Sequence, residues 1–178
     1  MTLSIPLSAV SASVASPSPT TASGPTRLAA LGYTLPAAPA AVGAYQTWAR
    51  FGPYVTTSFQ LPFKDGVLQH KGRLGEGVSL EQGMEAARIC ALNGLAQLTE
   101  AAGSFDGFRV IRIDGHVGCV EGFAHIPRVL DASSNLLNDV LGERGAHART
   151  ALGHLVMPLD APVMLGFFAE LFDQGKAS

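Results

Sequence analysis

The sequence predicts an α+β domain in which two helices cover one face of a mixed β-sheet. Three observations carry this prediction. Residues 79–102 contain no proline and begin with a helix-capping motif, residues 127–141 repeat apolar side chains at helical spacing, and segments rich in β-formers, separated by turn residues, lie on both sides of the helices. The predicted order of elements is β-β-(β)-α-β-α-β-β.

The chain begins with a segment that we do not expect to fold. Residues 1–26 carry no charged side chain and are rich in Ser, Thr, Ala and Pro. This composition predicts a disordered tail or, as the alternative, a weak targeting peptide, followed by a single domain over residues 27–178. One or two helical turns are predicted at residues 26–33, where Gly32 ends them, and residues 35–41 read as an extended Pro/Ala connector.

The first strands are predicted as a hairpin. Residues 45–50 and 54–60 contain β-formers, and the Phe-Gly-Pro sequence between them is typical of a turn. A second turn is predicted at residues 63–66, because Asp-Gly favours positive φ, and a short strand is predicted over residues 67–71.

The helix predicted over residues 79–102 has a clear local signal. Ser79 and Gln82 match a capping box, in which each side chain satisfies a free backbone N–H, and Gly103 provides the C-terminal stop. The apolar face follows the 3.6-residue period and comprises Ala87, Cys90, Ala91, Leu95 and Leu98. Because many of the residues in this segment are alanine, we expect the helix to approach the sheet closely.

The second half of the chain completes the sheet. Residues 108–119 form a predicted strand rich in β-branched side chains, and a helix begins near Pro127 and stops at Gly142. Two final strands are predicted at residues 147–156 and 162–172, with a turn between them. The second helix is expected to bury Leu130, Leu136, Leu137, Val140 and Leu141.

Composition excludes several classes of protein. Hydrophobic residues make up 47% of the 178 residues and charged residues 15%, which is too apolar for a wholly disordered chain. The net charge of −2 lacks the basic excess of a nucleic-acid-binding protein. No apolar run reaches the roughly 18 residues of a membrane helix, so a soluble protein is predicted. Two cysteines exclude a disulfide scaffold and suggest a reducing compartment, expected to be the cytoplasm, with the mitochondrion as the alternative.

Five segments, in this order along the chain, resemble the RidA/YjgF family, also called the endoribonuclease L-PSP family. They are residues 41–45 (AVGAY), 58–62 (SFQLP), 79–87 (SLEQGMEAA), 115–118 (GHVG) and 145–153 (GAHARTALG). The last segment, which is followed by a Met-Pro pair, is similar to the longer bacterial-type branch of the family.

This resemblance implies a fold, an assembly and a chemistry. The fold is chorismate-mutase-like (RidA-type), and the assembly is a homotrimer whose sheets form a central barrel, with clefts between neighbouring subunits. The implied reaction is the hydrolysis of reactive 2-enamine or 2-imine acids to 2-keto acids and ammonia, with no metal and no organic cofactor. The implied partners are a small carboxylate-bearing ligand and further copies of this chain, with neither nucleic acid nor membrane.

The resemblance also assigns candidate catalytic residues. Arg149 matches the family arginine that binds the substrate carboxylate, and a planar guanidinium suits this role because it donates two parallel hydrogen bonds and remains charged when partly buried. Without the matching sequence around it, an arginine at the start of a strand would be interpreted as a surface charge. Tyr45 matches a tyrosine that lines the cleft, with a core aromatic as the alternative.

Five further residues are candidates for substrate binding: Ser58, Phe59, Gln60, Cys119 and Asp131. Ser58, Phe59 and Gln60 correspond to a Ser-Gly-Gln-like turn whose backbone helps to form the cleft in relatives. Cys119 lies near a position that lines the cleft in some relatives, although a structural role is the alternative. The spacing of Cys119 from His116 and His125 matches no zinc site, so no metal is predicted.

Three departures from the family pattern keep a second function open. Phe59 replaces a glycine that lets the backbone approach the substrate, and Met164, which cannot orient a water molecule, replaces a glutamate. Asp131 stands where relatives often have asparagine, and it is expected to compete with a substrate carboxylate for Arg149. The alternative to an imine deaminase is therefore a non-catalytic small-molecule-binding trimer, or a regulatory or chaperone-like one.

The predicted trimer requires an apolar surface on the sheet. One face is expected to lie under the helices, and the other is expected to carry apolar side chains that neighbouring copies bury. Val55, Ile111 and Val117 are the candidates for that open face.

Overall fold

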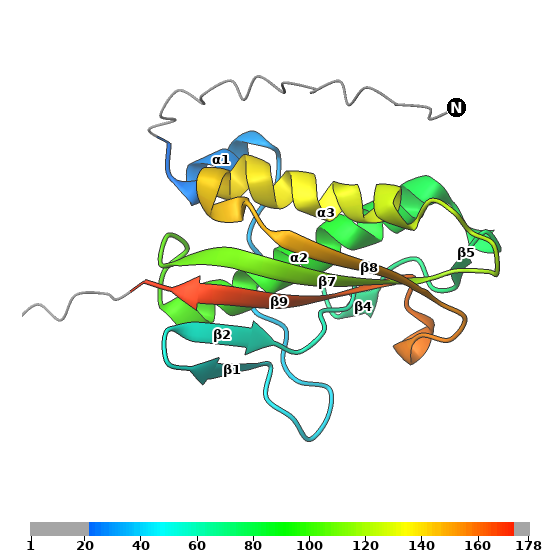
Figure 1. The fold of residues 1–178 in the computed structure, drawn as a ribbon, viewed down its shortest axis with the longest axis horizontal. Helices are drawn as coiled ribbons and strands as arrows, with labels where there is room; N and C mark the ends of the chain where they lie inside the picture. The colour runs from blue at the N-terminus through cyan, green and yellow to red at the C-terminus, as the bar shows by residue number, and fades with distance from the viewer. Residues whose placement is uncertain (1–21, 173–178) are drawn as a thin grey trace, which may run out of the picture.

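The computed structural model describes residues 22–172 and confirms the predicted α+β architecture (Figure 1). One five-stranded sheet has the strand order β1-β2-β9-β7-β8. Its neighbouring strands are antiparallel, except that β7 and β8 are parallel. The strands are β1 (Trp48–Phe51), β2 (Tyr54–Thr57), β7 (Phe108–Gly118), β8 (Ala148–His154) and β9 (Val163–Leu171).

Two helices, α2 (Leu80–Ala102) and α3 (Ile126–Leu141), pack against one face of this sheet, and α2 passes behind the strands in Figure 1. The core lies between the helices and the sheet. Its largest fully buried side chains include Phe108, Phe167, Leu95, Leu98, Ile113, Leu130 and Leu137. The predicted apolar faces of both helices are therefore confirmed.

The ends of α2 form as the local sequence predicts. Ser79 Oγ accepts a hydrogen bond from Gln82 N at 3.2 Å, and Gln82 Oε1 accepts one from Ser79 N at 2.9 Å, so the capping box is complete. Gly103 adopts φ 71°, which a residue with a side chain rarely adopts.

The expected close approach of α2 to the sheet occurs at Gly94. A Cβ atom on this residue would lie 2.1 Å from the Phe167 ring of β9, so only glycine fits the present spacing of the helix and the strand.

The open face of the sheet is not composed as predicted. Val55 and Val117 are buried at 1% and 0% exposure on the helix-covered side, and Ile111 lies at a β-bulge where the register with β9 shifts. A bulge inserts one residue and reverses the alternation that follows it. Consequently the side chains that point away from the helices after Ile111 are those of Arg112, Asp114 and His116, which are only partly buried or exposed.

Short elements connect the main ones. The predicted turn at residues 63–66 joins β3 (Phe63–Lys64) to β4 (Val67–Leu68), with positive φ at Asp65 and Gly66. The short parallel pair of β5 (Arg73–Leu74) and β6 (Gly77–Val78) was not predicted, because two-residue strands leave no periodicity to detect. The 3-10 helices η1 (Gly142–Gly145) and η2 (Pro158–Asp160) flank β8.

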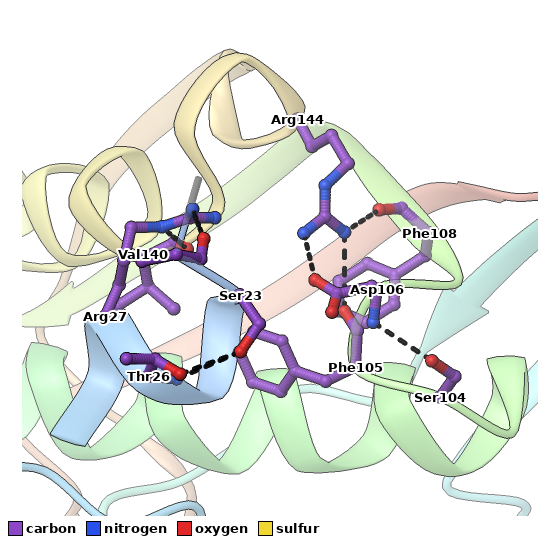
Figure 2. Close-up of polar contacts among 10 residues, drawn as sticks. Ser23, Thr26, Arg27, Ser104, Phe105, Asp106, Phe108, Val140 and Arg144 are labelled. Carbon is purple, nitrogen blue, oxygen red and sulfur yellow. Dashed lines mark hydrogen bonds and ion pairs between the residues drawn. The ribbon is translucent and has the colours of Figure 1, made fainter. Parts of the chain in front are cut away.

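Two arginines connect the N-terminal helix and the η1 segment to the rest of the domain by hydrogen bonds (Figure 2). Arg27 of α1 (Gly24–Ala30) donates from Nε to the carbonyl oxygen of Val140 at 2.7 Å, near the C-terminal end of α3. Arg144 donates to the carbonyl oxygen of Phe108 at 3.0 Å and forms an ion pair with Asp106. Both guanidinium groups donate to backbone carbonyl oxygens of other elements.

The boundary predicted at residue 26 falls within helix α1. Helix α1 begins at Gly24, Ser23 caps it by accepting from Thr26 N, and Gly24 packs against the Phe105 ring. These contacts place residues 23–26 in the domain, whereas residues 1–21 of the predicted tail lie outside the described residues.

Truncation distinguishes the two boundaries. Deleting residues 1–26 is expected to lower the Tm by about 2–4 °C, because the N-cap and the first turn of α1 contribute about 1 kcal/mol. Deleting residues 1–21 is expected to leave the Tm unchanged, and it serves as the matched control in differential scanning calorimetry. Equal melting temperatures for the two truncations would show that the first turn of α1 contributes nothing.

Candidate functional site

Arg149 lies on β8, at one edge of the sheet. It pairs in register with the buried Ile113 of β7, so its side chain points to the side of the sheet that carries α3. There its Nη1 atom lies 2.9 Å from Oδ1 of Asp131, a residue of α3. The Arg149 side chain is 22% exposed and the Asp131 side chain 54% exposed. The two charges therefore meet at the surface between an edge strand and a helix.

Ser134, one helical turn after Asp131, also contacts the guanidinium. Arg149 Nη1 donates a hydrogen bond to Ser134 Oγ at 3.0 Å, and the same hydroxyl lies 3.0 Å from Nε2 of His147. His147 Nδ1 contacts the carbonyl oxygen of Gly145, which can only accept, so Nδ1 carries the hydrogen. In the neutral ring Nε2 then accepts from the Ser134 hydroxyl, which leaves the serine lone pairs free to accept from Arg149.

These contacts hold one end of the guanidinium and leave the other open. Within residues 22–172, only Nη1 of Arg149 has a hydrogen-bond partner, and none is found for Nε and Nη2. Nε and Nη2 form one edge of the planar group and can donate two parallel hydrogen bonds to a carboxylate. A guanidinium held in this way has an edge that can accept an anion.

The sequence did not identify Ser134 and His147 as members of this cluster. Their signal is weak but present: Ser134 follows Asp131 at helical i+3 spacing, and His147 precedes Arg149 by two residues and so shares its side of the strand. The sequence alone does not show that α3 packs against β8, and this packing brings the residues together.

Tyr45 lies far from Arg149 in the same chain. It precedes β1 at the opposite edge of the sheet, and four strand spacings of about 4.8 Å each separate the two edges by roughly 19 Å. Tyr45 is 47% exposed and its hydroxyl accepts from Val42 N at 3.3 Å, so it is not a core aromatic in one copy of the chain. One copy of the chain cannot bring Tyr45 and Arg149 to one ligand.

The Ser58–Gln60 turn follows β2 and runs beside β9. The Gln60 backbone forms a bridge with Leu165 of β9, and its side chain donates to the carbonyl oxygen of Ser58 at 2.9 Å. Phe59 is 43% exposed, and its ring packs edge-to-face on His116 at a centroid distance of 4.8 Å and against Gly166. The phenyl ring thus occupies the surface over β9 and β7.

A histidine pair that was not predicted adjoins Phe59. His116 of β7 and His154 of β8 stack at 4.8 Å between ring centroids, with His116 Nδ1 2.6 Å from His154 Nε2. Burial lowers the pKa of His116, the neighbouring His154 lowers it further, and Asp114 partly opposes both effects. We expect His116 to be neutral at pH 7, so it contributes no charge to the open face.

The remaining candidate, Cys119, is buried in the core at 5% exposure. A Cβ atom on Gly153 of β8 would lie 2.9 Å from its Sγ atom, so the thiol fills the space beneath that glycine. Gly153 is four residues, or about 13 Å, along β8 from Arg149. Cys119 therefore does not share a site with Arg149 in one copy of the chain.

Residues 22–172 were also searched for a groove, a metal-binding cluster and a membrane-spanning helix. A groove of about 1090 Å³ lies between residues 32–42 and α2, and none of the predicted site residues lines it. No group of three metal-ligating side chains is found among the described residues. No helix in that part of the chain has the length and apolarity to cross a bilayer.

Comparison with known proteins identifies the family. A family model described as "YjgF/chorismate mutase-like, putative endoribonuclease" matches residues 25–171, which is most of the chain. The chain belongs to this family. The match spans all five strands of the main sheet and all three α-helices except the first residue of α1.

Three individual proteins are similar to the chain at 34–35% identity. Protein TCP17 of Trypanosoma cruzi is 34% identical over 143 residues, which cover 79% of this chain and 89% of TCP17. A Shewanella oneidensis crystal structure described as a putative endoribonuclease is 34% identical with a TM-score of 0.81, covering 84% of this chain and 100% of the other. Atu1372 of Agrobacterium tumefaciens, of unknown function, is 35% identical with a TM-score of 0.77, covering 83% and 92%.

Proposed function

We propose that this YjgF-family protein hydrolyses small 2-imino or 2-enamino acids to 2-keto acids and ammonia. One observation carries the proposal: Arg149 is held by Ser134 and Asp131 through Nη1, while its Nε and Nη2 atoms face no acceptor within residues 22–172. A ligand carboxylate bound to this edge would fix the adjacent C=N carbon for attack by water, which accelerates the reaction mainly through orientation. Water adds its oxygen to that carbon, and the C–N bond breaks to release ammonia.

The site is proposed to form between copies of the chain. Arg149 and Tyr45 lie at opposite edges of one sheet, so they can approach one another only across a contact between two copies. The open face of the sheet carries partly exposed aromatic and aliphatic side chains suited to such a contact: Tyr54, Phe59, Leu152 and Phe168. These residues replace Val55 and Val117 as the candidates for the buried surface of a trimer.

A homotrimer is the expected assembly. Light scattering at micromolar concentration should give a mass near three times the monomer mass of 18.5 kDa. Phe168→Asp places a charge in the proposed contact and should shift the mass toward that of the monomer. A wild-type mass near 18.5 kDa would contradict both the trimer and a shared site.

A second candidate function is favoured by two residues near the Ser58–Gln60 turn. Phe59 covers the surface where glycine would leave the backbone accessible, and Met164, which pairs with His116 in the sheet, offers no acceptor that could orient a water molecule. The alternative is a trimer that binds small carboxylates without hydrolysing an imine, as a regulatory or chaperone-like protein would.

One assay separates the two functions. A dehydratase generates 2-aminoacrylate, and the rate of pyruvate formation is followed with and without this protein. Faster pyruvate release with the wild-type protein, and not with Arg149→Lys, is the result expected for the deaminase. An unchanged rate, together with measurable carboxylate binding, would favour the binding protein.

A further inference from the structure

The ion pair of Arg149 and Asp131 leaves open the guanidinium edge that a ligand would use. Only Nη1 of Arg149 meets Asp131, at 2.9 Å, whereas an arginine and a carboxylate frequently form two hydrogen bonds. Arg112, on the neighbouring strand β7, donates from both Nε and Nη2 to Oδ1 of Asp114, at 2.8 and 2.6 Å. A carboxylate beside an arginine can therefore close the Nε–Nη2 edge, as Asp114 does on Arg112.

We propose that Ser134 and His147 are positioning residues that prevent Asp131 from closing the ligand-binding edge of Arg149. Ser134 Oγ accepts from Nη1 at 3.0 Å and so holds the end of the guanidinium that faces α3. To turn its Nε–Nη2 edge toward Asp131, the guanidinium would have to rotate and give up this hydrogen bond. The inference rests on the proposed function of Arg149 and assigns Ser134 and His147 a part in it.

His147 fixes the direction of the Ser134 hydroxyl. Its Nδ1–H donates to the carbonyl oxygen of Gly145, so in the neutral ring Nε2 can only accept, and it lies 3.0 Å from Ser134 Oγ. The single hydrogen of the hydroxyl is then used on His147. It is not available to Asp131, and the oxygen lone pairs remain free to accept from Arg149.

The backbone of η1 anchors this chain of hydrogen bonds. Gly145 is buried, and a Cβ atom on it would lie 2.4 Å from the carbonyl oxygen of Leu137, so only glycine lets η1 approach α3 this closely. The carbonyl group that accepts from His147 is thereby fixed relative to the helix that carries Ser134 and Asp131. The three hydrogen bonds all donate in one direction, from Arg149 toward Gly145.

A double-mutant cycle tests the inference through pyruvate binding to the full chain, measured by calorimetry. Ser134→Ala should weaken binding roughly two- to tenfold, the range that one hydrogen bond contributes, because Asp131 can then close the edge. In a protein that already carries Asp131→Asn, Ser134→Ala should change the affinity less than about twofold, because an uncharged amide competes weakly for the guanidinium. Asp139→Asn removes a charge from an exposed position two turns along α3, and in this matched background Ser134→Ala should weaken binding as in the wild type.

Two substitutions of His147 separate positioning from a general structural role. His147→Leu removes the acceptor of the Ser134 hydroxyl and should weaken pyruvate binding. His147→Gln offers the amide oxygen as an acceptor in place of Nε2 and should recover most of that loss. Both variants should retain the wild-type circular dichroism spectrum, since the His147 side chain is only partly buried.

The outcomes separate this inference from the proposed function. An unchanged affinity in Ser134→Ala, or an equal loss in the wild type and in Asp131→Asn, would overturn the positioning role and leave Arg149 as the anion site. An unchanged affinity in His147→Leu, or an equal loss in His147→Gln, would overturn the role of His147. Failure of the wild type to bind pyruvate, or an unchanged affinity in Arg149→Lys, would overturn the proposed function together with this inference.

Discussion

Arg149→Lys is expected to weaken carboxylate binding by roughly ten- to a hundredfold although the charge is retained. Lysine offers a single ammonium group and cannot donate the two parallel hydrogen bonds of the Nε–Nη2 edge. The loss corresponds to about 1.5–3 kcal/mol, the usual contribution of a hydrogen bond to a charged group. Titration calorimetry with pyruvate, 2-oxobutyrate and alanine measures the effect directly.

The structure provides a matched control and a check on folding for this variant. Arg73→Lys alters an exposed arginine of β5 that pairs with Glu76, away from β8, and should leave the affinity unchanged. Because Arg149 lies at a surface edge and a lysine can still pair with Asp131, Arg149→Lys is expected to retain the wild-type circular dichroism spectrum and mass. Equal affinities of Arg149→Lys and the wild type would show that the carboxylate binds elsewhere.

Gly94→Ala is expected to destabilise the domain by about 1–3 kcal/mol, the usual cost of overpacking a core. Its Cβ would lie 2.1 Å from the Phe167 ring, and Phe167 is 2% exposed, so either α2 must move away from β9 or the ring must leave its position. In an exposed helix the same change would stabilise by up to about 1 kcal/mol. Urea unfolding measures the change in the free energy of unfolding. A decrease for Gly94→Ala would show that the packing cost exceeds the gain in helix propensity.

A double-mutant cycle tests the cause of this destabilisation. Phe167→Leu alone should destabilise by opening a cavity, and in combination with Gly94→Ala it should destabilise by less than the sum of the two single changes. Additive effects would show that a methyl group added at Gly94 and the Phe167 ring do not interfere, and that the close approach of helix and strand at this point does not limit stability.

Local signals in the sequence predicted the elements of the fold well because their physical causes are local. The capping box of Ser79 and Gln82 and the stop at Gly103 involve residues within a single turn, and they define the ends of α2. The turn at Asp65 and Gly66 is likewise determined by the backbone preferences of two residues. The family resemblance added the topology, which no local pattern contains.

The predictions that were wrong or incomplete concern contacts between segments that are distant in the sequence. The bulge at Ile111 arises from the pairing of β7 with β9, and it reversed the predicted orientation of Val117. Arg149 and Asp131 were identified one by one, and their ion pair was expected, but Ser134 and His147 join them only because α3 packs beside β8. The separation of Tyr45 from Arg149 follows from the strand order, which requires knowledge of all five strands.

The position of β9 has a consequence for how the molecule is made. The last strand within residues 22–172 occupies the centre of the sheet, where Tyr54 of β2 pairs with Glu170 and Arg109 of β7 pairs with the same residue from the other side. Because β2 pairs with β1 and β9 only, the β1–β2 hairpin can join the sheet only after β9 has been synthesised. Such non-local pairing slows folding, and we expect a chain arrested before β9 to depend on chaperones to keep its unpaired strands from aggregating.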